Sequence, residues 1–238
     1  MLLAKSCHDL DWISHIMACP CRRVSSFGSL HHFRPEQAPA GAGTRCLDCA
    51  VEPACPYSAK KIYLGMVRRG HVGWPVSVLT PEPTEASVTA ALRDGPYGRC
   101  VYHCDNDVVD HQVVAMEFDG GRSATFTMTA FNPGSDRKTR IFGTRGQLEG
   151  DGATIWHSDF LTDKTVKIDP AQGSDGSLAS GHGGGDFGLA DAFVSAVAEN
   201  DPSHILTGIT ESLQSHLMVF AAEQSRLEGK VVTIEARV

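Results

Sequence analysis

The chain has 238 residues, enough for one domain with a full hydrophobic core or for two small domains. Hydrophobic residues make up 42% and charged residues 21% of it, a composition typical of a folded globular protein and not of a disordered one. The formal net charge of −7 and the lack of Lys/Arg runs longer than two argue against a nucleic-acid partner.

The sequence contains no membrane-spanning pattern, because Gly, Pro or Ser interrupts its uncharged stretches before they reach the roughly 20 apolar residues that a span needs. The first residues lack the basic-then-apolar order of a secretory signal. Eight cysteines in such a chain are typical of reduced thiols. We therefore expect a cytoplasmic protein without a membrane partner.

The first predicted element is a helix over residues 8–17, where apolar side chains recur at close to helical spacing. Pro20 ends it, and residues 22–33 have a weakly strand-like pattern. Residues 34–58 hold four prolines and three cysteines, and an apolar pattern resumes over residues 57–67. We interpret residues 34–58 as a long Cys/Pro-rich excursion within one domain that spans residues 1–238.

From residue 100 onward the apolar period changes to the alternation of β-strands, which favours an antiparallel sheet. The predicted strands are residues 100–104, 112–118, 123–131, 138–142, 153–157 and 165–168. Asp119-Gly120-Gly121 separates two of these runs and supplies the positive-φ residues of a tight hairpin.

Two helices follow a Gly/Ser-rich loop at residues 173–185. The first covers residues 186–199, with Asp186 suited to cap its N-terminus, and the second covers residues 207–228 and is predicted to pack on the sheet. Residues 231–234 form a last strand. The predicted fold class is α+β, with an open, mostly antiparallel β-sheet and helices packed on one face.

The sequence offers no nucleotide-binding motif in a suitable context. G-x-G-x-x-G occurs only at Gly183, Gly185 and Gly188, after a loop and not after the strand that a dinucleotide fold requires. We therefore expect no cofactor-binding residues in this chain. G-x-S-x-G and HExxH are also absent, which removes the usual starting points for a hydrolase or a zinc protease.

A first chemical cluster lies at the start of the chain, where Lys5, His8, Asp9 and Asp11 stand together. A histidine beside carboxylates suits proton transfer near neutral pH. The alternative is a histidine that caps the helix.

A second cluster, Cys46-x2-Cys49-x5-Cys55, could hold zinc with a fourth ligand from elsewhere. The candidates for that ligand are Cys19, Cys21, His31 and His32. Free thiols and a disulfide are the alternatives. Cys100 and Cys104, in a predicted strand, would share one face but lie too far apart to bridge each other.

An ordered set of segments resembles the C-terminal domain of the Gfo/Idh/MocA oxidoreductases, the group that contains glucose-fructose oxidoreductase and inositol dehydrogenases. These segments are residues 2–11 (LLAKSCHDLD), 95–100 (GPYGRC), 105–111, 142–146 (FGTRG), 182–186 (HGGGD) and 211–232. The resemblance covers nearly the whole chain.

The resemblance implies a two-domain enzyme, in which an N-terminal Rossmann domain holds NAD(P) and the C-terminal α+β domain presents a sugar or polyol substrate. It further implies hydride transfer from the substrate to nicotinamide, with His8 accepting or relaying the hydroxyl proton. The family's Asp, four residues before this His, is Ala4 here, and the neighbouring Lys5 is a second catalytic candidate if partly buried.

Further residues are substrate-binding candidates by the same resemblance, namely Asp9, Asp107, His111, His182 and Asp186. The alternatives are a solvated acidic loop with a satisfied histidine for Asp107 and His111, and plain helix capping for His182 and Asp186.

The predicted function is the substrate-binding and oligomerisation domain of an NAD(P)-dependent sugar or polyol dehydrogenase. We expect that its N-terminal dinucleotide-binding domain is absent, that the chain alone does not bind NAD or NADP and is inactive, and that it forms homo-oligomers through the sheet face. The alternative is a stand-alone, non-catalytic binding or assembly module, stabilised by zinc.

Overall fold

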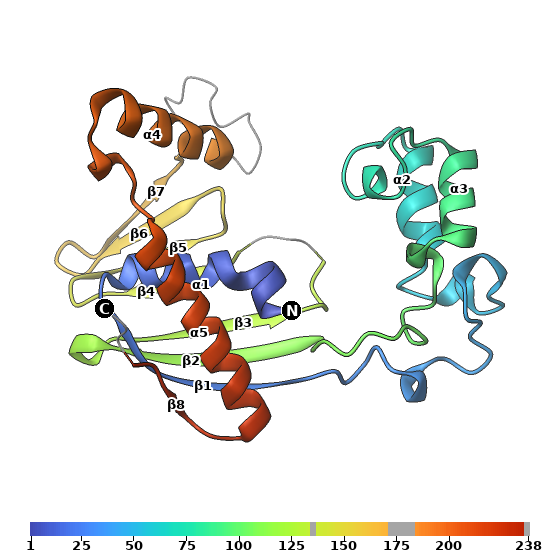
Figure 1. Cartoon of the computed structure of the whole chain (residues 1–238), viewed down its shortest axis with the longest axis horizontal. Helices are drawn as coiled ribbons and strands as arrows, with labels where there is room; N and C mark the ends of the chain where they lie inside the picture. The colour runs from blue at the N-terminus through green and yellow to red at the C-terminus, as the bar shows by residue number, and fades with distance from the viewer. Residues whose placement is uncertain (134–136, 171–183, 236–238) are drawn as a thin grey trace. The chain divides into compact units, whose positions relative to one another are not determined.

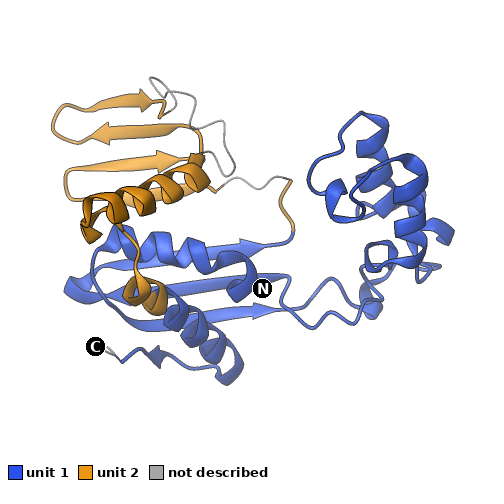
Figure 2. Ribbon diagram, turned by 45° about the horizontal axis from the view of Figure 1, so that its top comes forward, with its two compact units in different colours: residues 1–130, 215–238 blue, residues 131–214 orange. Residues whose placement is uncertain are grey.

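The computed structural model describes residues 1–133, 137–170 and 184–235 and divides into two compact units. The first unit comprises residues 1–130 and 215–238, and the second comprises residues 131–214 (Figure 2). Among the helices of the described residues, none is both long and apolar enough to cross a membrane.

The first unit is built on a four-stranded antiparallel sheet with the order β3-β2-β1-β8 (Figure 1). Its strands are β1 (Cys21–Ser29), β2 (His111–Phe118), β3 (Ser123–Thr129) and β8 (Val232–Thr233). Gly120 and Gly121 adopt φ angles of 74° and 77° in the β2–β3 connection. This confirms the hairpin predicted from Asp119-Gly120-Gly121, because positive φ favours glycine.

Helices α1 (Cys7–Met17) and α5 (Ile209–Glu228) cover one face of this sheet (Figure 1). Alternate residues of β2 point into the core beneath them, as the period of a strand requires. The buried apolar cluster that joins sheet and helices contains Leu2, Leu10, Cys21, Val24, Val114, Met116, Phe118, Met218, Val219, Ala221, Ala222 and Ile234. The predictions of both helices and of their packing on one sheet face are confirmed.

Polar contacts also tie α5 to the sheet. The Ser26 backbone N–H donates to Ser225 Oγ at 2.9 Å, and Gln112 Nε2 donates to Ser26 Oγ at 2.9 Å. All three residues are buried, and a buried polar group without a partner is costly. These bonds therefore favour one register of α5 on the strands.

Between β1 and β2 the chain leaves the sheet and forms what we call the cysteine lobe, residues 30–109. The lobe contains 3-10 turns, a π-helical turn (Lys60–Leu64) and the helices α2 (Gly65–Arg68) and α3 (Glu85–Asp94). Thr84 and Ser87 cap α3 reciprocally. The core of the lobe is a small separate cluster of Cys46, Ala59, Leu64, Val76, Val88 and Leu92.

One predicted strand of the lobe is wrong, because residues 100–104 form a turn. The His103 backbone N–H donates to the Cys100 carbonyl at 3.0 Å, and the Cys104 thiol donates to the same carbonyl at 3.2 Å. These local bonds close the chain on itself, so the two cysteines do not share a strand face.

The second unit contains another four-stranded antiparallel sheet, with strand order β4-β5-β6-β7. Its strands are β4 (Thr139–Phe142), β5 (Gly146–Gly150), β6 (Ile155–Asp159) and β7 (Lys164–Ile168). Strand β5 was not predicted from the sequence, since its terminal glycines resemble turn residues. The α+β class with antiparallel sheets is confirmed, and the strands are divided between two sheets.

Helix α4 (Gly185–Glu199) follows the second sheet in the chain. Its N-cap residue is Gly184, so the prediction that Asp186 caps the helix is wrong, and Asp186 lies in the first turn. Its large apolar side chains are exposed, with 74% exposure at Leu189 and 62% at Phe193. This helix therefore presents an apolar face outside the cores of the described chain.

Candidate functional site

The predicted catalytic residues at the start of the chain lie on or just before α1. Leu10 is fully buried and anchors the helix, whereas the neighbouring His8 side chain is 57% exposed. His8 Nε2 lies 3.6 Å from Asp9 Oδ2, which is an ion-pair contact and too long for a hydrogen bond. Lys5 is exposed, so the partial burial on which its catalytic role depended is not found.

Asp110 and His111 form a second acid–histidine pair at the start of β2. Asp110 is only 2% exposed, and its Oδ2 accepts backbone N–H bonds from His31 at 2.9 Å and His32 at 2.6 Å, with a longer one from Phe33. Its Oδ1 lies 2.8 Å from His111 Nδ1. Burial alone would raise the pKa of Asp110, but these donors outweigh it and the pKa lies below its usual value.

An ionised Asp110 determines the tautomer of His111. A carboxylate only accepts hydrogen bonds, so His111 Nδ1 carries the proton and, in the neutral ring, Nε2 keeps its lone pair. The ring is 43% exposed. Asp110 is therefore a buried positioning residue for a solvent-accessible imidazole.

The two histidines belong to different elements of the first unit. His8 stands in the first turn of α1, and His111 is the first residue of β2. Helix α1 begins toward the end of the first sheet at which β2 starts (Figure 1).

The remaining predicted substrate-binding residues belong to other parts of the chain. Asp107 is exposed in the irregular segment before β2. Asp186 belongs to the second unit, and His182 lies outside the described residues.

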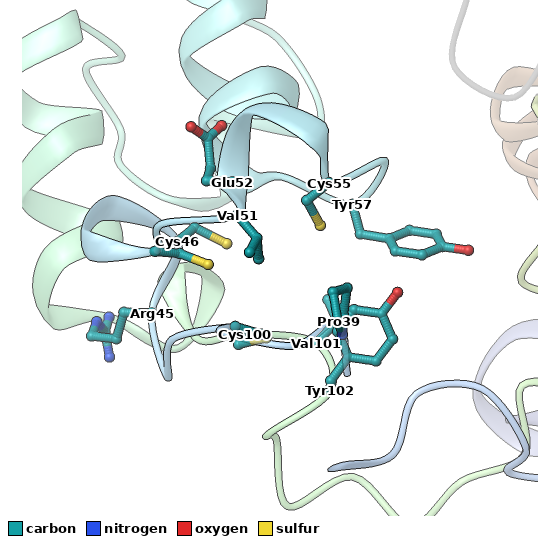
Figure 3. Close-up of a pocket in the computed structure, with 12 residues that line it drawn as sticks. Pro39, Arg45, Cys46, Val51, Glu52, Cys55, Tyr57, Cys100, Val101 and Tyr102 are labelled. Atoms are coloured by element: carbon teal, nitrogen blue, oxygen red, sulfur yellow. The ribbon is translucent and has the colours of Figure 1, made fainter. Parts of the chain in front are cut away.

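The three clustered cysteines line a small cavity of about 20 Å³ in the cysteine lobe (Figure 3). Three of the cysteines that line it come from one short segment of the sequence, namely Cys46, Cys49 and Cys55. The fourth, Cys100, comes from a segment far away in the sequence. None of the fourth ligands considered from the sequence lines it. Cys19 instead contacts the carbonyl of Asp119 and Cys21 is buried in the core of the sheet.

The thiols that line this cavity lie close enough to affect the pKa of Cys46. Burial raises the pKa of Cys46, and the nearby Cys100, Cys55 and Cys49 raise it further. The Gly43 backbone N–H donates to Cys49 Sγ at 3.3 Å. Within residues 1–133, 137–170 and 184–235, no three His, Cys, Asp or Glu side chains already stand at metal-binding separations.

Comparison with known proteins relates part of this chain to a known family. Residues 76–149, which include His111 and β2 to β4, match the family model described as the GFO/IDH/MocA C-terminal domain. A curated relative is YteT of Bacillus subtilis (strain 168), whose name describes an oxidoreductase, with 22% identity over 201 residues. That match covers 76% of this chain but only 43% of YteT.

Solved structures of oxidoreductases share the fold. An oxidoreductase domain protein from Kribbella flavida matches with a TM-score of 0.57 and 15% identity, over 98% of this chain and 51% of that one. A levoglucosan dehydrogenase in complex with NADH and levoglucosan matches with a TM-score of 0.52 and 13% identity, over 98% of this chain and 50% of that one. The chain thus spans about half the length of these relatives.

Two features of the sites escaped the sequence analysis. Asp110 was not singled out among the neighbouring aspartates, although it alone directly precedes a histidine that begins a strand. Cys100 was assigned to a strand, and only the fold brings it beside the cysteine cluster.

Proposed function

We propose that this chain is the substrate-binding and oligomerisation domain of an NAD(P)-dependent sugar or polyol dehydrogenase. The observation that supports the proposal is the Asp110-held His111 at the start of β2, inside the segment that matches the GFO/IDH/MocA C-terminal domain model. The similar levoglucosan dehydrogenase, which holds NADH and a sugar derivative, supports the substrate class.

The residues described do not fit a dinucleotide. All pairings within both sheets are antiparallel in the described chain, so these sheets contain no parallel βαβ unit to receive a pyrophosphate. We therefore propose that a separate domain supplies the nucleotide site, and we assign no step of the nucleotide chemistry to this chain.

The role left to this chain is to bind the substrate and to manage its hydroxyl proton. His8 is the proposed proton acceptor, since its ring is exposed and its Nε2 lies 3.6 Å from Asp9 Oδ2. His111 is the proposed substrate-positioning residue, because Asp110 fixes its ring and leaves Nε2 to accept a bond from a substrate hydroxyl.

Sugar binding tests this function directly. Saturation-transfer NMR of the whole chain with a panel of aldoses and polyols should detect binding of at least one compound, which His8→Gln and His111→Gln weaken. His15→Gln, an exposed histidine at the other end of α1, is the matched control and should bind normally. Absence of binding across the panel, or equal binding by all three variants, would contradict the proposal.

Nucleotide titration provides a second test. We expect no NADH or NADPH binding by this chain at micromolar concentrations, measured by nucleotide fluorescence. Micromolar binding would contradict the assignment of the nucleotide to a separate domain, whatever the outcome with sugars.

We further propose self-association through the open face of the first sheet. On that face Phe27 is 72% exposed and Val113 is 42% exposed. Light scattering of the chain should show an oligomer, and Phe27→Asp should shift it toward the monomer. A wild-type monomer would contradict this part of the proposal.

The second candidate, a non-catalytic binding or assembly module, is favoured only by the cavity that the cysteines line. Sugar binding that depends on His8 and His111 would argue against it. All eight cysteines are free, which fits the reducing cytoplasm that we propose as the location.

A further inference from the structure

We propose that Cys46, Cys49, Cys55 and Cys100 form a four-thiolate site for one zinc ion, which stabilises the cysteine lobe. This inference is independent of the proposed dehydrogenase function. It rests on the four sulfur-bearing side chains that line one cavity of the lobe (Figure 3).

The backbone brings the fourth cysteine to the other three. Arg45 and Arg99 form an antiparallel bridge, and the Cys100 backbone N–H donates to the Thr44 carbonyl at 2.8 Å. Cys46 and Cys100 directly follow the two bridged arginines in the chain, and both line the cavity. The fold therefore completes a ligand set of which the sequence shows only three members.

The cavity has the size and the chemistry for a single ion. Its volume of about 20 Å³ slightly exceeds the 10–15 Å³ that one water molecule needs, and an iron–sulfur cluster is much larger. Four thiolates in a tetrahedron favour zinc among the common divalent metals. The C-x2-C spacing of Cys46 and Cys49 is also typical of zinc sites.

Backbone donors already support the sulfur atoms. Gly43 N–H donates to Cys49 Sγ, and the backbone of Ala59 donates to Cys46. Such outer contacts orient metal-binding thiolates. The nearby Glu52 is committed elsewhere, because it accepts from Ser58 Oγ and pairs with Lys60 Nζ at 2.6 Å. Cysteines are thus the ligands that remain for a cation in the cavity.

Zinc binding requires the side chains to rotate. Sulfur atoms around zinc stand about 3.8 Å apart, given Zn–S bonds of about 2.3 Å, and the four thiols are not yet at such separations. Figure 3 shows the Cys46 and Cys55 sulfur atoms pointing toward a common space that Val51 also borders. Replacement of the thiol protons by one dication supplies the attraction that draws the sulfur atoms together.

The lobe has a structural need for such a site. Its buried apolar cluster has only small and medium side chains, from Ala59 to Leu92, and most of its chain is in short turns. Small regions with so little core commonly depend on a metal or a crosslink.

The first test uses the wild-type chain, purified under reducing conditions without chelator. Elemental analysis should find about one zinc per chain. Counting of reactive thiols should show four of the eight cysteines protected until a chelator is added, and mass spectrometry should map the protected four to the cavity. Zinc at trace level only, iron in its place, or a disulfide between any two of the four would overturn the proposal.

The second test compares two serine variants from the same turn. Cys100→Ser should lower zinc affinity at least tenfold, whereas Cys104→Ser, whose residue does not line the cavity, should retain one zinc. Equal zinc content in both variants would overturn the assignment of Cys100. If Cys100→Ser does not fold, Cys100→His restores a ligand and should recover zinc, and thiol mapping of the wild type decides the matter without any variant.

Discussion

Different kinds of contact stabilise the sheet of the first unit and the cysteine lobe. The sheet buries an extended apolar cluster, with Phe118 and Met218 among its members, between its strands and two helices. The lobe has a smaller apolar cluster, in which leucine is the largest side chain. It also has polar anchors, including the Glu52–Ser58–Lys60 contacts and the Arg45 bonds to the carbonyls of Leu92 and Gly95. Apolar burial is spread over many contacts, whereas each anchor depends on one or two groups, so single substitutions should act globally in the sheet and locally in the lobe.

The largest effect is expected from Phe118→Ala. Phe118 is 2% exposed in the core of the sheet, so removing its ring should lower the free energy of unfolding by about 3–5 kcal/mol, measured in denaturant. Phe27→Ala, on the open face of the same sheet, is the control and should change stability little. If Phe118→Ala lowered the free energy of unfolding by less than about 1 kcal/mol, apolar burial would not be the main source of stability in the sheet.

Gly98→Ala tests the lobe by steric conflict. A Cβ at Gly98 would stand 1.6 Å from the Leu92 carbonyl oxygen, so the backbone must move, at a cost of about 3 kcal/mol. Hydrogen exchange should accelerate within the lobe and remain unchanged in β2 and β3. Gly188→Ala in α4, where a Cβ would meet nothing within 4 Å, is the control. Equal acceleration in the strands would show that the lobe does not open separately.

Asp110→Asn tests the anchor between the two regions. Loss of the charge weakens the bonds from the His31, His32 and Phe33 amides and from His111, which should cost about 2 kcal/mol.

The pH dependence of the same anchor has a defined sign. Because the pKa of Asp110 lies below its ordinary value of 3.8, its contribution is complete above that value and is lost as the pH falls below it. Denaturation curves between pH 7 and pH 3 should therefore converge for wild type and Asp110→Asn at low pH. A stability difference between the two proteins that stays the same down to pH 3 would contradict this role of the Asp110 carboxylate.

The smallest effect is expected at the cap of α3. Thr84→Ala removes the acceptor of the Ser87 amide and should cost about 1 kcal/mol. Because Thr84 and Ser87 cap the helix reciprocally, the double variant with Ser87→Ala should cost less than the sum of the two single changes.

The same contrast explains what the sequence could predict. The elements of the sheet and its covering helices were found from their periodicity, since burial on one face imposes a period of 2 on strands and of 3.6 on helices. In the lobe, five residues at 100–104 alternate like a strand but form a turn, because bonds to the Cys100 carbonyl outweigh so short a pattern. The candidate histidines could be chosen from the sequence, because their side-chain chemistry suits proton transfer. The burial of Asp110 and the proximity of Cys100 to the other three cysteines depend on tertiary contacts.

The cysteine lobe connects two strands that pair directly with each other. Ser29 and His111 are paired across β1 and β2, so the whole cysteine lobe is the connection of a single β-hairpin. The entropy cost of closing a connection rises only slowly with its length, and here both of its ends are already adjacent. We therefore expect that a two-residue turn can replace the lobe without changing a ladder bond of the sheet, although the amides that hold Asp110 would be lost with it.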